Sequence, residues 1–259
     1  MSRVVVSGAT GQTGGAVVAA GQERDDLEIV AGLASTAGEA SGVPISPATE
    51  AERVLREADA DTVVDFSVPG ATVAVAEAAA DVGVPLVTGT TGFDDGQAAA
   101  LADAADAIPV LQAANFSRGI QALLAAVAEA VAVLPGYDVE LVETHHNRKV
   151  DAPSGTAAAI VDAVQEQRDV EPVYGREGDA PRAAEEMGIF ARRAGDVRGE
   201  HELLLAGNDE VLTLSHRAED RGVYAAGALD AGEWLVGREP GQYDFADVIH
   251  KGGVDEELL

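Results

Sequence analysis

Residues 3–21, Arg-Val-Val-Val-Ser-Gly-Ala-Thr-Gly-Gln-Thr-Gly-Gly-Ala-Val-Val-Ala-Ala-Gly, decide the fold of this chain. The β-branched run 3–7 predicts a buried strand, the stretch 8–14 a glycine-rich turn, and residues 15–21 a helix. This order is the setting that a dinucleotide-binding motif requires, because glycines permit a tight turn and let the backbone approach a pyrophosphate. A purely structural turn between strand and helix is the alternative interpretation.

Predicted strands and helices continue to alternate as far as residue 117. Strands are expected at 27–33, 62–66, 85–88 and 109–113, and helices at 48–58, 71–81 and 94–107. Repeated βα units predict an α/β protein with a Rossmann-like, doubly wound parallel sheet that binds ligands at the carboxyl ends of its strands. Small residues in the post-strand segments 67–70, 89–92 and 113–117 would let a cofactor approach the backbone there.

The pattern changes after Ser117. A long apolar helix is expected at 119–134, strands at 138–144, 187–194, 201–206 and 210–215, a loop at 165–186 and a helix at 219–234. Strands that follow one another predict a second, α+β domain with a four-stranded mixed sheet. We therefore predict a dinucleotide-binding domain over 1–117, completed by 227–259, and a substrate-binding and oligomerisation domain over 118–226.

The composition is that of a globular protein, with 47% hydrophobic residues. There is no cysteine, which excludes disulfides and thiol catalysis. The first residues lack the basic and apolar regions of a signal peptide, and no apolar run approaches the roughly 18 residues that a membrane helix needs. These features predict a cytoplasmic protein without a membrane partner.

Acidic residues far outnumber basic ones. The chain has 45 Asp and Glu against 17 Lys and Arg, a formal net charge of −28, and the acids are spread along its whole length. Such a surface argues against nucleic acid as a partner. With only two lysines, Lys149 and Lys251, adaptation to a high-salt cytoplasm is favoured over an ordinary acidic cytosolic protein.

We expect the protein to unfold at a lower temperature in dilute buffer than in molar potassium chloride. Molar salt shortens the Debye length to about 3 Å and screens the repulsion between surface carboxylates. Thermal unfolding followed by circular dichroism at both salt concentrations measures the difference. A chain that unfolds more readily in concentrated salt would contradict the adaptation.

The densest group of candidate catalytic residues lies in 140–156, Glu-Leu-Val-Glu-Thr-His-His-Asn-Arg-Lys-Val-Asp-Ala-Pro-Ser-Gly-Thr. Turn formers and hydroxyls at 153–156, followed by alanines, predict a helix start. Free N–H groups and the positive end of the helix dipole bind carboxylates at such a place. The stretch therefore predicts a site for a small anionic molecule.

Histidine, and lysine with a lowered pKa, are suited to proton transfer near neutral pH, which favours His145 and Lys149 as catalytic residues. If a strand ends here, His145 and His146 point to opposite faces, so that one can meet the reacting centre while the other holds a carboxylate. The remaining histidines, His201, His216 and His250, are interpreted as structural. Zinc is disfavoured because neither a cysteine nor a third well-spaced histidine accompanies the pair.

The second predicted strand bears on the choice of cofactor. NAD-type motifs place an acid near its tip for the ribose 2′-hydroxyl. Here the strand is followed by Ala34, Ser35 and Thr36, and the two hydroxyls could donate hydrogen bonds to a 2′-phosphate. These features are compatible with NADPH, with NADH tolerated, but no arginine stands beside the two hydroxyls, so the preference between the two cofactors stays open.

Segment 143–156 closely resembles the signature of the 4-hydroxy-tetrahydrodipicolinate reductase family, also called dihydrodipicolinate reductases. The resemblance extends over nearly the whole chain, through segments 8–14, 64–67, 88–93, 114–117, 193–201 and 234–237. It implies reduction of 4-hydroxy-tetrahydrodipicolinate, with loss of its hydroxyl, to tetrahydrodipicolinate in lysine and diaminopimelate biosynthesis. It also implies NADPH and/or NADH as cofactor, and a homotetramer built by the sheet of the second domain.

Carried over by position, the resemblance implies that His145 is a general acid/base and Lys149 a proton donor. The expected contacts of the small dicarboxylate substrate are His146, Ser154, Gly155 and Thr156. The expected cofactor contacts are Gly8, Ala9, Thr10, Gly11, Gln12, Thr13, Gly89, Thr90, Thr91, Ala113, Ala114, Asn115 and Phe116. Ser35 is added to them because of its hydroxyl at the tip of the second predicted strand, not because of the resemblance. The chain departs from the family at Ala34 and Ser35, which replace a frequent acid, and at Val68, where some relatives have a basic residue.

Two other functions stay open at this level. A dinucleotide-sensing regulator would bind NAD(P) without turnover, but a lysine retained at position 149 in so lysine-poor a chain argues against it. A reductase of other amino-dicarboxylates, such as an aspartate dehydrogenase-like protein, would explain two domains but not the spacing of residues 149–156. Turnover with aspartate and NAD would separate such a reductase from a member of the dihydrodipicolinate reductase family.

Overall fold

The computed structural model describes residues 1–220 and 222–251. The chain forms two compact units, one of Met1–Ser117 with the described part of Arg221–Leu259, the other of Arg118–Asp220. The second unit begins at the apolar helix that the sequence places after Ser117.

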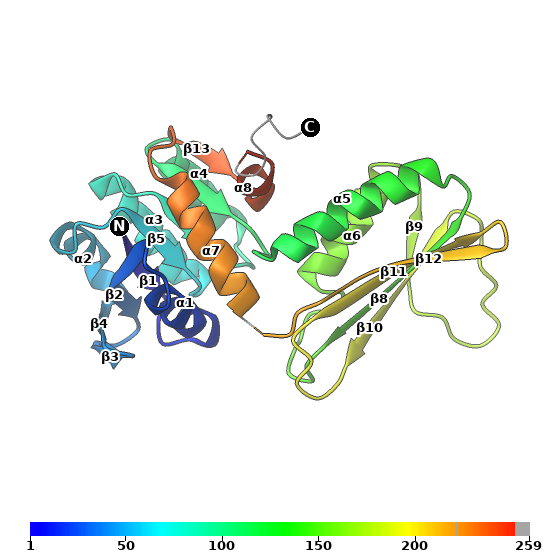
Figure 1. The fold of residues 1–259 in the computed structure, drawn as a ribbon, viewed down its shortest axis with the longest axis horizontal. Helices are drawn as coiled ribbons and strands as arrows, with labels where there is room; N and C mark the ends of the chain where they lie inside the picture. Colours follow the sequence, from blue (N-terminus) through cyan, green and yellow to red (C-terminus); the bar gives the residue numbers. More distant parts are fainter. Residues whose placement is uncertain (221, 252–259) are drawn as a thin grey trace. The chain divides into compact units, whose positions relative to one another are not determined.

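The first unit is built on an eight-stranded sheet in the order β13-β7-β6-β5-β1-β2-β4-β3 (Figure 1). Its strands are β1 Ser2–Ser7, β2 Leu27–Ala34, β3 Gly38–Ala40, β4 Val43–Pro47, β5 Thr62–Asp65, β6 Leu86–Thr88, β7 Pro109–Gln112 and β13 Gly241–Tyr243. Neighbouring strands are parallel, apart from the antiparallel pair of β3 and β4. The strand order reverses between β1 and β5, and ligands bind at such a switch point.

Helices cover both faces of this sheet (Figure 1). They are α1 Gln12–Gln22, η1 Ala48–Glu50, α2 Ala51–Glu57, α3 Pro69–Val82, α4 Asp95–Ala105, α7 Gly222–Leu235 and α8 Phe245–Lys251. The apolar side chains of β1 contribute to the cores on both faces of the sheet, because successive side chains of a strand point to opposite faces. Val4 and Val6 join the core with α1, α7 and α8, whereas Val5 joins the core with α2, α3 and α4.

The second unit is built on a five-stranded sheet in the order β12-β11-β8-β10-β9. Its elements are α5 Arg118–Val133, β8 Asp138–His145, α6 Gly155–Gln165, β9 Glu171–Tyr174, β10 Glu186–Arg193, β11 Glu200–Gly207 and β12 Glu210–Arg217. Strands β8, β9 and β10 are parallel, and β11 is antiparallel to β8 and β12. Helices α5 and α6 bury one face, where Leu141, Ile189 and Leu203 lie in the core.

The α/β class, the doubly wound sheet and the second sheet are confirmed, but the expectation of four strands in the second sheet is wrong. The fifth strand, β9, lies inside the stretch expected to be a loop. It has four residues, Glu-Pro-Val-Tyr, and lies at the sheet edge, where a proline is tolerated. So short and polar a segment pairs only because β10 offers it a free edge.

The boundary near the C-terminus also differs from the expected one. The first unit resumes before α7, at 221 instead of 227. Helix α7 is continuous over Gly222–Leu235 and buries Ala225, Ala228 and Leu229 in the core of the first unit. A boundary within it would cut a single packed helix. The elements β3, β4, β13 and α8 are short and were not expected from the sequence.

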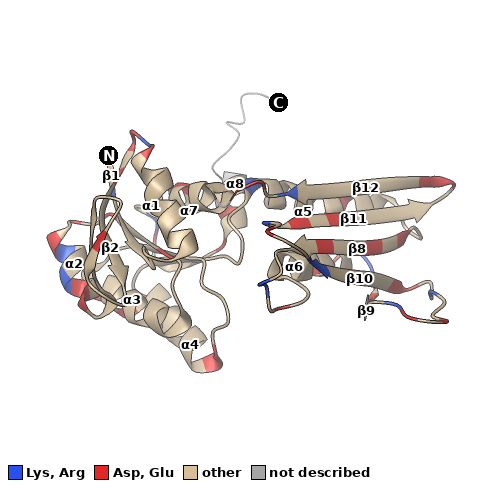
Figure 2. Ribbon diagram, turned by 90° about the horizontal axis from the view of Figure 1, so that it is seen from below, with Lys and Arg blue, Asp and Glu red and all other residues tan. Residues whose placement is uncertain are grey.

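Charged residues follow the pattern expected from composition. Acidic residues occur along the elements of both units, with fewer basic ones between them (Figure 2). Within residues 1–220 and 222–251, no helix has the length and apolar character needed to cross a membrane.

Candidate functional site

The turn after β1 has no room for a side chain at Gly8 or at Gly14. Gly8 has a φ of +74°, and a Cβ there would lie 2.2 Å from the carbonyl oxygen of Phe66. A Cβ on Gly14 would lie 2.1 Å from the carbonyl oxygen of Gly8. Gly11 caps α1 without a side-chain hydrogen bond, so the first-turn N–H groups are left for a ligand. Thr10, Gly11 and Gln12 are exposed, and the turn therefore fits the pyrophosphate of a dinucleotide.

We expect Gly14→Ala to destabilise the protein by about 2 kcal/mol or more, because its methyl group meets fixed backbone. Gly15→Ala is the matched control. The nearest atom to a Cβ on Gly15 is at an ordinary 3.6 Å, and alanine is the better helix former. Urea unfolding of both variants checks the difference. Equal stabilities would show that the turn relaxes without cost.

A buried carboxylate joins the segments that follow β5 and β6. Asp65 is fully buried at the end of β5. Its Oδ1 accepts a hydrogen bond of 2.6 Å from the Ser67 hydroxyl. Its Oδ2 accepts bonds of 2.7, 2.9 and 2.8 Å from the hydroxyls of Thr72, Thr88 and Thr90. The side chain of Asp65 thus fixes the loop that contains the expected cofactor contacts Gly89, Thr90 and Thr91.

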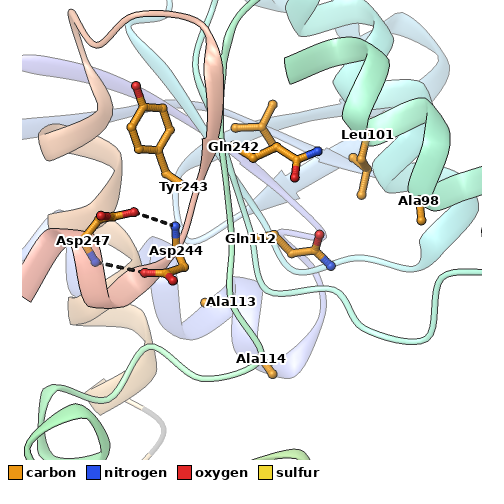
Figure 3. Close-up of a pocket in the computed structure, with 10 residues that line it drawn as sticks. Ala98, Leu101, Gln112, Ala113, Ala114, Gln242, Tyr243, Asp244 and Asp247 are labelled. Atoms are coloured by element: carbon orange, nitrogen blue, oxygen red, sulfur yellow. Dashed lines mark hydrogen bonds between the residues drawn. The ribbon is translucent and has the colours of Figure 1, made fainter. Parts of the chain in front are cut away.

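The segment after β7 borders a cavity of about 620 Å³ (Figure 3). Ala113 and Ala114 line it, together with residues of α4, β13 and α8. The ring of Phe116 is instead buried in the core against Phe66 and Phe245, with ring centroids 5.6 and 5.3 Å apart. Because its ring is committed to the core, Phe116 can offer a ligand only its backbone.

The remaining cofactor candidates lie at the same edge of the sheet. Ala9 is buried in the turn two residues after β1, and Thr13 lies in the first turn of α1. The Asn115 side chain accepts a hydrogen bond of 2.8 Å from the Ser117 N–H. Ser35 and Thr36 follow β2 directly and are exposed. Both hydroxyls are therefore accessible beyond the tip of that strand.

The second unit brings the predicted proton-transfer residues together at one end of its sheet. Alternation along β8 places Glu143 and His145 on the same face, and the register sets His201 opposite Glu143. The Nδ1 atom of His145 lies 2.6 Å from Oε2 of Glu143, which is fully buried. The His145 and His201 rings meet edge to face with centroids 5.2 Å apart.

Arg193 of β10 anchors this carboxylate. Its Nη1 and Nη2 donate hydrogen bonds of 2.8 and 2.7 Å to Oε2 and Oε1 of Glu143. Burial alone would raise the pKa of Glu143, but the hydrogen bonds from Arg193 and His145 outweigh it and lower the pKa. Glu143 is therefore ionised at neutral pH.

His145 and His201 are both poor proton donors at neutral pH. Burial lowers the pKa of His145, although the Glu143 carboxylate opposes the change. Burial and the nearby His145 lower the pKa of His201 to about 4. His201 Nε2 lies 3.0 Å from the Ser154 hydroxyl. Both rings are thus neutral under physiological conditions.

The loop from β8 to α6 carries the candidate cations. His146 follows the strand directly and is half-buried. The Lys149 side chain is 20% exposed, and its Nζ donates a hydrogen bond of 2.8 Å to Oδ2 of Asp151. Arg193 Nη2 also donates a bond of 2.7 Å to the Asp151 carbonyl oxygen. Arg193 therefore connects the loop of Lys149 to the carboxylate that holds His145.

The helix start after this loop forms as the sequence predicts, with Ser154 as N-cap of α6. Its Oγ accepts a hydrogen bond of 3.1 Å from the Ala157 N–H, and its own N–H donates a bond of 3.2 Å to Glu143 Oε1. The polar groups of Ser154 are therefore used inside the protein. Gly155 is exposed and Thr156 is 9% exposed, so the first-turn N–H groups beside them are the better anchor for a carboxylate.

Sequence reasoning did not single out Glu143, Arg193, His201 or Asp65. Glu143 could have been found, because it lies two residues before His145 on a strand and so shares its face. The interpretation of His201 as an isolated structural histidine misses its position beside His145. Among the described residues, no three His, Asp or Glu side chains gather as metal ligands.

Two family models match the chain, one described as dihydrodipicolinate reductase, N-terminus, over residues 2–116, and one as dihydrodipicolinate reductase, C-terminus, over residues 119–249. A 4-hydroxy-tetrahydrodipicolinate reductase of Haloarcula marismortui is 62% identical over 250 residues, 96% of this chain and 99% of the relative. One of Natronomonas pharaonis is 54% identical over 248 residues, 95% of this chain and 99% of the relative.

Among solved structures, the dipicolinate-bound dihydrodipicolinate reductase from Paenisporosarcina sp. TG-14 superposes with a TM-score of 0.76 at 22% identity, covering 94% of this chain and 97% of that chain. An amine dehydrogenase from Mycobacterium smegmatis gives a TM-score of 0.62 at 14% identity, covering 94% and 95% of the two chains. These two likenesses show a shared fold. The two sequence relatives come from haloarchaea, which agrees with the high-salt adaptation predicted from the net charge.

Proposed function

Because this chain belongs to the dihydrodipicolinate reductase family, we propose that it reduces 4-hydroxy-tetrahydrodipicolinate to tetrahydrodipicolinate in the biosynthesis of lysine and diaminopimelate. The substrate gains a hydride and a proton and loses water. The observation that carries the proposal is the match to this family over nearly the whole chain. It coincides with a site in which His145 and Lys149 lie beside a helix start suited to carboxylates.

The family uses a nicotinamide cofactor, and the turn after β1 fits its pyrophosphate. The residues proposed to hold it are the backbone of 8–13, the loop Gly89 to Thr91 and the segment 113–116. When bound, the cofactor supplies the hydride. NADPH is the proposed preference, because Ser35 and Thr36 are exposed beyond β2. The tip of this strand carries no acidic residue, which would repel a 2′-phosphate.

The proton is proposed to come from Lys149. His145 is neutral at neutral pH because burial lowers its pKa, whereas an ammonium carries protons that it can donate. Lys149 is held by Asp151, and its side chain is only 20% exposed, which fixes the position of its Nζ atom. His145 then accepts a hydrogen bond or a proton from the substrate through its free ring nitrogen.

The two carboxylates of the substrate are proposed to bind the cationic loop and the start of α6. Gly155 and Thr156 offer backbone N–H groups at the positive end of the helix dipole. His146 and Lys149, in the loop that precedes this helix, are the proposed side-chain contacts. Ser154 contributes indirectly, by capping the helix.

We further propose a cytoplasmic homotetramer that assembles through the face of the second sheet opposite α5 and α6. Val142, Phe190 and Leu204 alternate with core residues along their strands, so they lie on that face, and each is half-buried. Apolar side chains on an open sheet face are a suitable interface. Sedimentation velocity in potassium chloride measures the assembly.

The decisive experiment is oxidation of NADPH and of NADH by the purified protein in concentrated potassium chloride with freshly generated 4-hydroxy-tetrahydrodipicolinate. Substrate-dependent oxidation supports the function, and the two rates give the cofactor preference. Aspartate with NAD is the control for the alternative amino-dicarboxylate reductase. A folded protein that binds cofactor but does not turn over this substrate would overturn the proposal.

A further inference from the structure

We infer that Glu143 is a positioning residue that fixes the ring orientation and the tautomer of His145, with Arg193 holding the carboxylate in place. This inference rests on the proposed function for its catalytic consequence, but its geometric part concerns the protein alone. Glu143 contacts no reacting group, and it acts only through His145.

The first step is the chemistry of the contact between the two side chains. An ionised carboxylate only accepts hydrogen bonds, so His145 must donate from Nδ1 across the 2.6 Å contact. A neutral imidazole that carries its proton on Nδ1 has a lone pair on Nε2. That nitrogen makes no hydrogen bond to any described residue. The contact thus leaves His145 with an acceptor nitrogen for the substrate.

The second step is the rigidity of the carboxylate. Both oxygens of Glu143 are bound by Arg193 in the bidentate geometry that guanidinium and carboxylate groups prefer. Oε1 accepts a further bond from the Ser154 N–H. The Glu143 side chain is 0% exposed. A group held by three donors besides His145 cannot rotate, so the imidazole that it holds cannot rotate either.

The third step is the charge around His145. The charged and titratable groups that face it are Glu143 on the same strand, Arg193 on β10, His201 on β11 and Lys149 in the loop. Glu143 raises the pKa of His145, whereas Lys149 and Arg193 lower it along with burial. Arg193 therefore offsets the Glu143 charge, which would otherwise favour a protonated ring without a lone pair.

Glu143→Gln gives the sharpest test, because the amide has the same shape. Arg193 has only donors and takes the amide oxygen, so the NH₂ group must face Nδ1 of His145. Nδ1 then becomes an acceptor, and the ring proton moves to Nε2. We expect kcat to fall about 100-fold, as when an orienting carboxylate or outer-shell partner is lost. Substrate KM and cofactor binding should change less than about threefold, because Glu143 is fully buried and is not among the proposed contacts of either ligand.

Glu140→Gln is the matched control. Glu140 lies on the same strand, is 25% exposed and binds Arg176 and Arg182, and within the described part of the chain it makes no hydrogen bond or ion pair with a histidine. Its replacement should leave kcat unchanged. An equal loss of kcat in both variants would overturn the positioning role.

Nitrogen NMR of histidine-labelled protein tests the tautomer without any turnover, with the His145 signal assigned from a His145→Gln variant. In the wild-type protein at neutral pH we expect a protonated Nδ1 and an unprotonated Nε2, and in Glu143→Gln the reverse, with a lower His145 pKa. A wild-type ring protonated on Nε2 would overturn the inference, even if Glu143→Gln does not fold. A wild-type protein without turnover but with the expected tautomer would overturn the proposed function instead.

Discussion

Replacing Lys149 with alanine is expected to lower kcat by about 10²- to 10⁴-fold, the usual contribution of a positioned proton donor. The methyl side chain has no proton to give, and water cannot occupy the same place with the same geometry. Binding of NADPH, followed by its fluorescence, should be unchanged because the cofactor candidates lie in the first unit. His145→Ala is expected to lose most of its turnover in the same way.

Arg148→Ala is the matched control for Lys149→Ala. Arg148 is the neighbouring cation, but its side chain is 58% exposed and pairs with the exposed Asp196. Its removal should change kcat by less than about threefold, since exposed ion pairs contribute little. Full activity of Lys149→Ala would remove this lysine from the mechanism. A large loss in Arg148→Ala would show that the loop needs charge in general and not an ammonium at one position.

Replacing Asp65 with alanine is expected to destabilise the protein by at least about 3 kcal/mol. Four hydroxyl groups lose their acceptor at once, and each buried unsatisfied group costs about 1–3 kcal/mol. The costs are not additive, because some hydroxyls will find other partners. Unfolding in urea at constant potassium chloride measures the loss. NADPH should also bind more weakly, since the loop from Gly89 to Thr91 loses its anchor.

Two further variants test whether the effect of Asp65→Ala is specific to this carboxylate. Asp65→Asn keeps one acceptor oxygen and should lose clearly less stability than the alanine variant. Asp103→Ala removes an exposed carboxylate from α4 and should stay within about 0.5 kcal/mol of the wild type. If Asp65→Ala were as stable as Asp103→Ala, the four hydroxyls would not depend on this carboxylate, and another feature would have to order the loop.

Local sequence patterns were enough to place most of the elements. The run 3–21 indicates strand, turn and helix, and the structure has β1, the Gly8 turn and α1 there. Alternating segments likewise indicate β2, β5, β6 and β7. The Pro153 to Thr156 pattern indicates the start of α6, where Ser154 is the N-cap. Such signals are local, because capping residues and apolar periodicity act within a few residues.

Elements that lack a strong local signal were missed. Strand β9 has four residues and contains a proline, so its formation depends on the edge of β10. The start of α7 at Gly222 was also misplaced, by three residues. A short segment has too few residues to show a periodicity that distinguishes a strand from a loop. Whether it forms a strand therefore depends on the neighbouring strand with which it can pair.

The sequence by itself determined the α/β class, the glycine turn and the stretch that holds His145 and Lys149. Only the tertiary structure decided which residues surround them. Glu143 meets Arg193 across 50 positions of the chain, and Ser154 meets His201 across 47. These contacts follow from the register between β8, β10 and β11, which packing of the whole sheet fixes. A histidine that is isolated in the sequence can therefore lie next to His145 in the folded protein.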